Sequence, residues 1–147
     1  MKSRKLLAAV AVAVLSLTGC VMAPGSGATP EEARDRFIGI LDSTQATLGG
    51  RWQKKDDPTA RNCTIPLWVE GIRFPGLRLG DAPPESPMAA LATVEEHWDT
   101  LDVTSERTEV GDVSELRGTN PSGDLFIFRA NPDAMTLQGE SECRPKE

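Results

Sequence analysis

The chain has 147 residues, which is enough for one domain that buries its own core. Its 22 acidic and 16 basic residues give a formal net charge of -6. An acidic surface repels nucleic acid and anionic lipid headgroups, so the charge argues against both as binding partners.

The first nineteen residues are predicted to be a secretory signal peptide. Three basic residues within 2–5 precede a mostly apolar run over 6–17, and small residues follow at Thr18 and Gly19. The apolar run has 12 residues, whereas a spanning helix needs roughly 20. We therefore expect segment 1–19 to be removed rather than to stay in the membrane.

The residues Leu17-Thr18-Gly19-Cys20 resemble the bacterial lipobox, in which a leucine stands three residues before a cysteine. The resemblance implies cleavage after Gly19 and a diacylglycerol thioether on Cys20, which becomes the new N-terminus. Each buried lipid methylene contributes about 0.8 kcal/mol, so two long acyl chains hold a domain at the membrane. We therefore expect a lipoprotein at the cell membrane, facing outside the cytoplasm. An ordinary signal peptide with a coincidental cysteine is the alternative.

The chain after residue 19 has 128 residues with 13 basic and 22 acidic side chains, a net charge of -9. Residues 20–29 comprise the lipidated cysteine and a small, uncharged stretch rich in Gly and Pro, which predicts a flexible tether. Residues 30–147 are predicted to form a single domain.

Two cysteines remain once Cys20 carries lipid. Cys63 and Cys143 are expected to form a disulfide, because an exported protein folds where thiols are oxidised. The bridge closes a loop of about 80 residues, which stabilises the fold by at most roughly 4 to 5 kcal/mol. A metal-binding or redox pair is the alternative, but no Cys-x-x-Cys motif supports it.

Two amphipathic helices are predicted, over 30–48 and 87–101. Thr29 and Glu32 form a capping box around Pro30, and Ser86 caps the second helix. Apolar side chains recur at helical spacing on both: Ala33, Phe37, Ile40, Leu41 and Leu48, then Leu91, Val94, Trp98 and Leu101.

Strand candidates surround the second helix. Before it, short strands are expected at 51–54, 63–69 and 71–79, with Pro66 placing the middle one at an edge and Pro75-Gly76 forming a turn or bulge. After it, 102–110, 112–117, 124–130 and 135–143 read as a meander with hairpin-length turns. The predicted fold is α+β, with two helices on one face of a mostly antiparallel sheet.

Candidate catalytic residues are few. His97 is the only histidine and Ser141 lies in a Gly139-Glu-Ser-Glu-Cys143 stretch that lacks the second glycine of a nucleophile elbow. One histidine and two paired cysteines are too few for a zinc site, and the acidic residues lack a calcium-loop pattern. We expect no enzyme activity, no metal and no cofactor.

Two tryptophans are candidates for a partner or cleft surface. Trp52 and Trp68 stand in irregular stretches, where a large aromatic side chain can line a binding surface or simply fill the core. Trp98 belongs to the core by its helical spacing.

Beyond the lipobox, the chain resembles the small LppA-like lipoproteins of actinobacteria. The resemblance comprises a tryptophan before Cys63-Thr-Ile-Pro66, a second one at the end of the middle helix, and the closing Leu137-Gln-Gly-Glu-Ser-Glu-Cys143. It implies a location and a domain type and no catalytic residues.

The expected function is that of a membrane-anchored envelope lipoprotein with a non-enzymatic domain that binds another envelope protein. The alternatives are a carrier that holds a lipid or other hydrophobic cargo between the helices and the sheet, and an envelope hydrolase.

Overall fold

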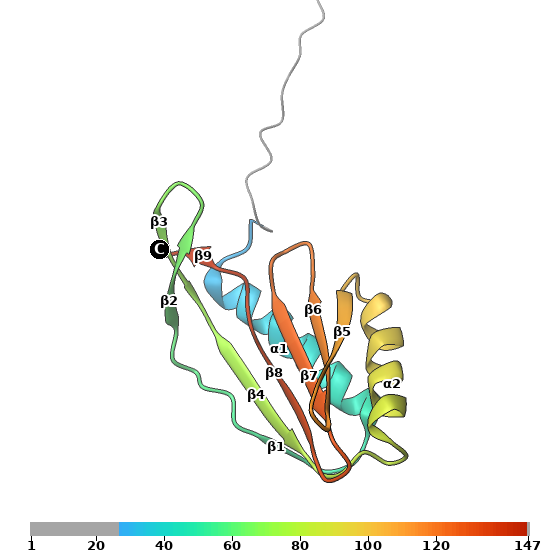
Figure 1. Cartoon of the computed structure of the whole chain (residues 1–147). Helices are drawn as coiled ribbons and strands as arrows, with labels where there is room; N and C mark the ends of the chain where they lie inside the picture. The colour runs from blue at the N-terminus through green and yellow to red at the C-terminus, as the bar shows by residue number, and fades with distance from the viewer. Residues whose placement is uncertain (1–26, 147) are drawn as a thin grey trace, which may run out of the picture.

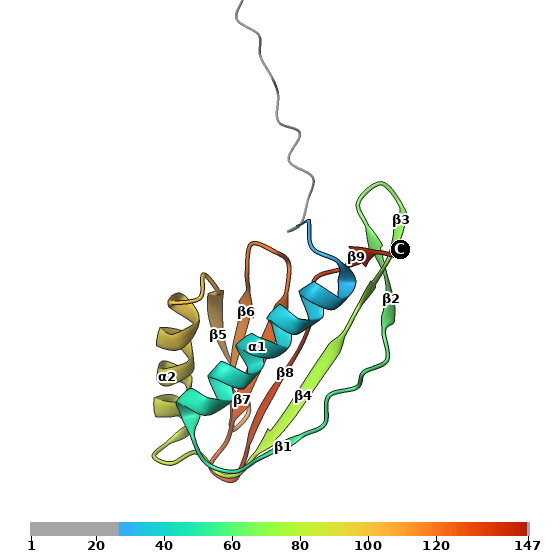
Figure 2. The same cartoon turned by 180° about the vertical axis from the view of Figure 1, so that it is seen from behind.

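The computed structural model describes residues 27–146 as an α+β domain in which two helices cover one face of a six-stranded antiparallel sheet (Figures 1 and 2). The predicted fold class is confirmed. The expected signal peptide, the expected lipobox and the expected tether up to residue 26 lie outside the described residues. The elements are α1 (Pro30–Leu48), β1 (Trp52–Lys54), β2 (Arg61–Ile65), β3 (Val69–Arg73), β4 (Pro75–Gly80), α2 (Pro87–Asp99), β5 (Thr104–Val110), β6 (Val113–Thr119), β7 (Leu125–Ala130), β8 (Met135–Glu140) and β9 (Arg144–Pro145).

Helix α1 begins as its capping residues predict. Thr29 Oγ1 accepts a hydrogen bond from the Glu32 amide at 3.2 Å, and Glu32 Oε2 accepts one from the Thr29 amide at 2.9 Å. These contacts satisfy two amides that would otherwise lack partners at the helix start. Helix α2 is likewise capped by Ser86, but it ends at Asp99, two residues earlier than expected.

The large sheet has the order β1-β4-β8-β7-β6-β5, and every neighbouring pair is antiparallel. The three hairpins β5–β6, β6–β7 and β7–β8 follow the chain, as the turn lengths predict. Strand β7 lies inside the sheet between β8 and β6, which explains why its residues 125–128 are apolar on both faces.

A second, three-stranded sheet of order β2-β3-β9, which the sequence pattern does not predict, extends from the end of the large one. Here the predicted disulfide is confirmed: Cys63 and Cys143 are bridged with their Cα atoms 6.0 Å apart. The bridge joins β2 to the segment between β8 and β9. Gly71 lies underneath it, where a Cβ would stand 2.7 Å from Cys143 Sγ.

Two of the early strand predictions are wrong in their boundaries. The expected strand 63–69 is two strands, because the chain turns back at Pro66-Leu67-Trp68, and the proline sits in the turn rather than at a sheet edge. The Pro75-Gly76 pair is not a turn but the start of β4, and the chain passes from β3 to β4 through Phe74 alone. The expected last strand, 135–143, ends at Glu140.

The core lies between the helices and the large sheet. Phe37, Trp98 and Phe126 are fully buried, and the Phe126 ring centroid lies 5.5 Å from that of Phe37 and 5.7 Å from that of Trp98. Trp98 Nε1 donates to Thr44 Oγ1 at 3.0 Å, so its polar atom is satisfied inside the core. Close approach of α1 depends on glycine, because a Cβ at Gly139 would stand 3.1 Å from Phe37 Cε2.

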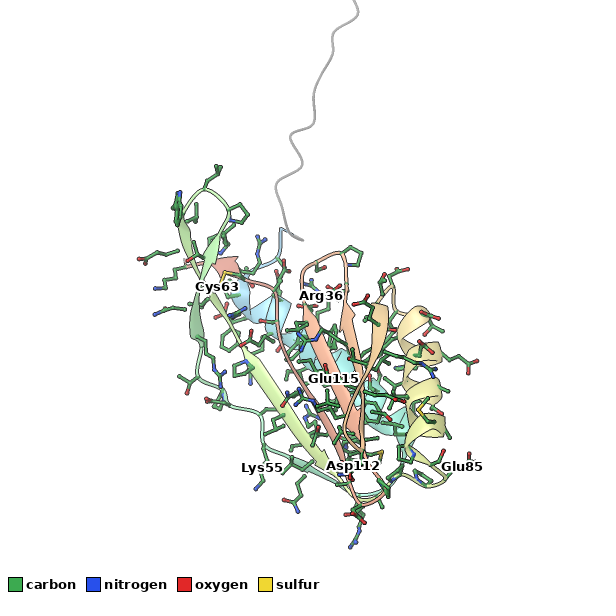
Figure 3. The ribbon with its side chains drawn as sticks, in the orientation of Figure 1. Arg36, Lys55, Cys63, Glu85, Asp112 and Glu115 are labelled. Atoms are coloured by element: carbon green, nitrogen blue, oxygen red, sulfur yellow. A yellow bond between two sulfur atoms is a disulfide. The ribbon has the colours of Figure 1, made fainter. Side chains whose placement is uncertain are left out.

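The domain has two distinct ends. The start of α1, the β6–β7 loop and the β2–β3 hairpin lie at one end, which we call the tether end (Figures 1 and 2). The β5–β6 and β7–β8 turns and the start of α2 lie at the other, which we call the far end. Figure 3 shows Cys63 toward the tether end, and Glu85 and Asp112 at the far end.

Candidate functional site

The face of the large sheet turned away from the helices holds a groove of about 360 Å³. Because strand side chains alternate, Leu77 of β4 and Ile127 of β7 point to this open face while their neighbours point into the core. Leu77, Leu125 and Ile127 form the apolar floor, and the half-buried Gln138 adds an amide to it. The segment 55–61, which links β1 to β2, forms one wall.

The rim of the groove is charged with both signs. Lys55 and Arg61 supply positive charge, and Asp57 and Glu140 supply negative charge. Arg73 Nη1 forms an ion pair with Glu140 Oε2 at 2.8 Å. Arg61 Nη1 lies 3.8 Å from Glu140 Oε1. The hydrogen bond from the Thr59 amide lowers the pKa of the Asp57 carboxyl, so this rim residue is ionised at neutral pH.

A buried arginine cluster fixes the wall of the groove. Arg78 is fully buried on the helix-facing side of β4, and its guanidinium binds Asp56 through Nε and Nη2 and Asp42 through Nη1. Asp56 Oδ1 also accepts from the Leu77 amide at 3.0 Å. The cluster therefore ties the wall segment to β4 and to α1 at once.

The second distinctive surface is the turn of the β2–β3 hairpin. Leu67 and Trp68 are 91% and 90% exposed, and Val69 beside them is 44% exposed. Both Leu67 (φ 71°) and Trp68 (φ 64°) adopt the left-handed backbone region that favours glycine. We call Leu67-Trp68-Val69 the hairpin tip.

The hairpin tip is physically linked to the start of the described chain. Arg144 of β9 donates a hydrogen bond from Nε to the Ala28 carbonyl oxygen at 2.6 Å, and the same residue is the register partner of Ile72 in β3. The described chain therefore begins beside the sheet that carries the tip.

A second buried charge cluster joins α1, the β6–β7 loop and the segment that follows β8. Asp124 and Glu142 are buried, and Arg36 of α1 pairs with both. Burial raises the pKa of the Asp124 carboxyl, and hydrogen bonds from Asn120 Nδ2 and the Glu142 amide only partly offset this effect. These contacts hold the β6–β7 loop against the segment that follows β8.

The structure separates the two tryptophans that the sequence analysis singled out. Trp52 is half-buried near the end of α1, where its Nε1 donates to the Gly49 carbonyl oxygen at 2.8 Å, and its ring lies over Gly80. It packs against the core cluster. Trp68 is part of the hairpin tip, which lies at the opposite end of the domain. The two do not share a surface.

The candidate catalytic residues do not come together. His97 Nε2 lies 2.9 Å from Ser43 Oγ, a pairing between α2 and α1 that sequence spacing could not reveal. Ser43 Oγ also lies 3.0 Å from the Ile40 carbonyl oxygen, so the serine hydroxyl has a second hydrogen-bond partner within α1. Ser141 is buried, and its Oγ accepts from the Phe74 amide at 2.9 Å and donates to the Glu142 carbonyl oxygen.

Residues 27–146 contain neither a metal-binding cluster of side chains nor a helix that could span a membrane. Within that range no three or more His, Cys, Asp or Glu side chains gather in a way that could hold a metal ion. Over the same part of the chain, neither helix has the length and apolar character needed to cross a bilayer.

No protein-family model matches this chain, and no curated protein matches it. Among solved structures, the fold resembles the crystal structure of a DUF4853 family protein from Actinomyces odontolyticus ATCC 17982, with a TM-score of 0.66 and 16% sequence identity. The match covers 84% of this chain and 72% of that one. At this level of identity the likeness establishes the shared fold alone.

Proposed function

We propose that this protein is a membrane-anchored envelope lipoprotein whose domain binds a segment of another envelope protein in the groove on the open sheet face. The anchor is the lipid expected on Cys20. The observation that carries the binding proposal is the groove itself, which both helices leave uncovered.

The chemistry of the groove suits a polypeptide. Its apolar floor of Leu77, Leu125 and Ile127 can take an aliphatic or aromatic side chain, and the Gln138 amide can pair with a peptide group. The rim carries both signs of charge, which suits mixed polar side chains around an apolar anchor. Protein interfaces commonly have this arrangement of apolar centre and polar rim.

Packing between the layers argues against a carrier of hydrophobic cargo. The space between helices and sheet is filled by Phe37, Leu41, Trp98, Phe126 and Phe128, all with no exposed surface. A cargo there would have to displace these side chains from contacts with one another. The groove lies on the other side of the sheet and is open along its length.

Photo-crosslinking in intact cells tests the binding proposal. A photoreactive amino acid at Gln138 should give a covalent adduct with a specific second protein. The matched control is the same amino acid at Glu96, which is exposed on α2 on the helical side of the domain. Identical adduct patterns from Gln138 and Glu96, or none from Gln138, would overturn the proposal.

Substitution of the lipobox cysteine tests the anchor. Cys20→Ser should leave the precursor uncut or release the domain from the membrane fraction, whereas Cys63→Ser removes a different cysteine and should not affect attachment. Unchanged membrane attachment of the Cys20→Ser chain would refute lipidation as the anchor.

A further inference from the structure

We propose that the hairpin tip is a second membrane contact, with Leu67, Trp68 and Val69 entering the interfacial layer of the bilayer that holds the Cys20 lipid. This inference rests on the lipid anchor of the proposed function. It adds an orientation of the domain, in which the tether end faces the bilayer.

The chemistry of the tip suits the interface between lipid and water. A tryptophan with an apolar ring and a polar N–H prefers the headgroup layer, and a neighbouring leucine can reach the acyl chains. The stretch 62–69 contains no ionisable side chain apart from the bridged Cys63. The next residue, Glu70, pairs with Lys146 at 3.4 Å, so its charge is partly compensated beside the bilayer.

The fold gives the tip no structural role. Leu67 and Trp68 are nine-tenths exposed, so they contribute almost nothing to packing in the isolated domain. Their left-handed backbone conformation would be satisfied better by glycine or asparagine. A contiguous apolar group that is both exposed and conformationally unfavourable marks a contact with something outside the domain.

The place where the chain enters the domain selects the bilayer as that contact. Six residues lie between Cys20 and Gly27, and the seven residue steps from one to the other give the tether a reach of at most about 25 Å. The Arg144–Ala28 hydrogen bond fixes the end of this tether beside β9, and β9 pairs with β3 at Gly71 and Ile72. The tip stands three residues beyond Gly71, about 10 Å farther along the hairpin. A domain tied this closely at the tether end brings its tip to the lipid surface.

Fluorescence of the lipidated protein in vesicles tests the inference. The protein is purified from its own membrane and reconstituted in phosphatidylcholine vesicles in which part of the lipid carries brominated acyl chains. Trp98 is buried and Trp52 lies near the far end, so bromine should quench Trp68 alone. Quenching and protection from acrylamide should both disappear in Trp68→Phe and persist in the matched variant Trp52→Phe.

Two other outcomes would overturn the inference. If acrylamide quenches Trp68 in vesicles as readily as it quenches a free tryptophan derivative in water, the tip does not touch lipid and the inference is wrong. If Trp68 is shielded in native membranes but not in pure lipid vesicles, a protein covers the tip, which also overturns it.

The mass of the protein in the same sample shows whether Cys20 carries diacylglycerol, so the anchor and the membrane contact of the tip are tested separately. A protein without diacylglycerol on Cys20 refutes the anchor. The tip is then judged by adding that protein to brominated vesicles: quenching of Trp68 supports a membrane contact, and its absence contradicts one.

Discussion

Arg144 and Ala28 are joined by a 2.6 Å hydrogen bond between a guanidinium N–H and a carbonyl oxygen, across 116 positions of sequence. The bond fastens the first described residues to the last strand. Because that strand pairs with β3, the entry point of the tether and the exposed hairpin become parts of one rigid end. This relationship connects the lipobox, a feature of sequence alone, to a surface that only the fold reveals.

The hairpin tip should be dispensable for stability. Trp68→Gly removes a left-handed tryptophan that costs about 1–2 kcal/mol, while glycine adds about 0.5–1 kcal/mol of unfolded-state entropy. Denaturant titration should therefore show a change within about 1 kcal/mol and no clear loss. The buried Trp98→Ala should cost about 3–5 kcal/mol in the same assay. A large loss from Trp68→Gly would mean that the tip supports the fold.

Two glycine-to-alanine substitutions should have opposite signs. At Gly139 the new Cβ would stand 2.0 Å from the Leu125 carbonyl oxygen, and overpacking of this kind costs about 1–3 kcal/mol. Gly39 is exposed on α1 with nothing within 4 Å, so alanine there should stabilise the helix by about 0.5–1 kcal/mol. Thermal unfolding of both variants checks this, and equal effects would contradict the close approach of the β7 backbone to Gly139 of β8.

The buried arginine should matter far more than an exposed one. Arg78→Met leaves Asp56 and Asp42 without their shared partner; because these carboxylates are 19% and 45% exposed, the cost should stay below the about 3–5 kcal/mol of a fully buried pair. Arg51 pairs with Asp81 at 2.9 Å, but its side chain is 90% exposed, so Arg51→Met should cost less than about 1 kcal/mol. Urea titration of the two variants measures the difference. Comparable losses would show that Arg78 is more hydrated than its burial indicates.

The same cluster should make stability depend on pH. Burial opposes ionisation of Asp42, but the hydrogen bonds from Lys54 and Arg78 outweigh it and hold its pKa below the ordinary 3.8. A carboxyl with a lowered folded-state pKa stabilises the protein above pH 3.8, and this contribution disappears as the pH falls through the folded-state pKa. Asp42→Asn should therefore destabilise at pH 7 and lose that effect in acid.

Asp124 should behave in the opposite way, because burial raises its folded-state pKa above 3.8. Its contribution is present below pH 3.8 and is lost as the pH rises through the raised folded-state pKa. Asp124→Asn keeps one acceptor oxygen in place of two, so it loses either the Asn120 or the Glu142 hydrogen bond at every pH, and the informative quantity is the slope. Relative to the unsubstituted protein, this variant should gain stability between pH 4 and pH 7. If the stability of the Asp42→Asn and Asp124→Asn variants, relative to the unsubstituted protein, changed with pH in the same direction, the lowered pKa of Asp42 and the raised pKa of Asp124 would be contradicted.

The helices and the meander could be predicted because their signals are local. The capping box at Thr29 and Glu32 marks the start of α1 to the residue, and the hairpin-length turns place β5 to β8 in order. The disulfide could be predicted from the expected export of the protein and from the two cysteines that remain after Cys20. Each of these depends on residues close in sequence or on composition, so no knowledge of packing was needed.

The functional surfaces could not be predicted because they depend on distant residues or on exposure. The groove floor combines Leu77 with Ile127, fifty positions apart, which only the β4-β8-β7 order brings near one another. No local pattern predicts that Arg78 is buried, because its carboxylate partners Asp42 and Asp56 come from two other segments. The sequence marks Trp68 as a candidate surface residue, but the apolar run 63–69 predicts a strand where the chain in fact turns at Pro66-Leu67-Trp68.

The most direct test of the account measures the orientation of the lipidated domain on a bilayer. A fluorescent donor is attached at Ser122→Cys in the β6–β7 loop or at Asp112→Cys in the β5–β6 turn, with acceptor lipids in the vesicle (Figures 1 and 3). Strand β6 has seven residues, which span about 23 Å, so energy transfer from position 122 should be clearly stronger than from position 112. Equal transfer from both positions, or stronger transfer from position 112, would contradict a domain that stands on its tether end.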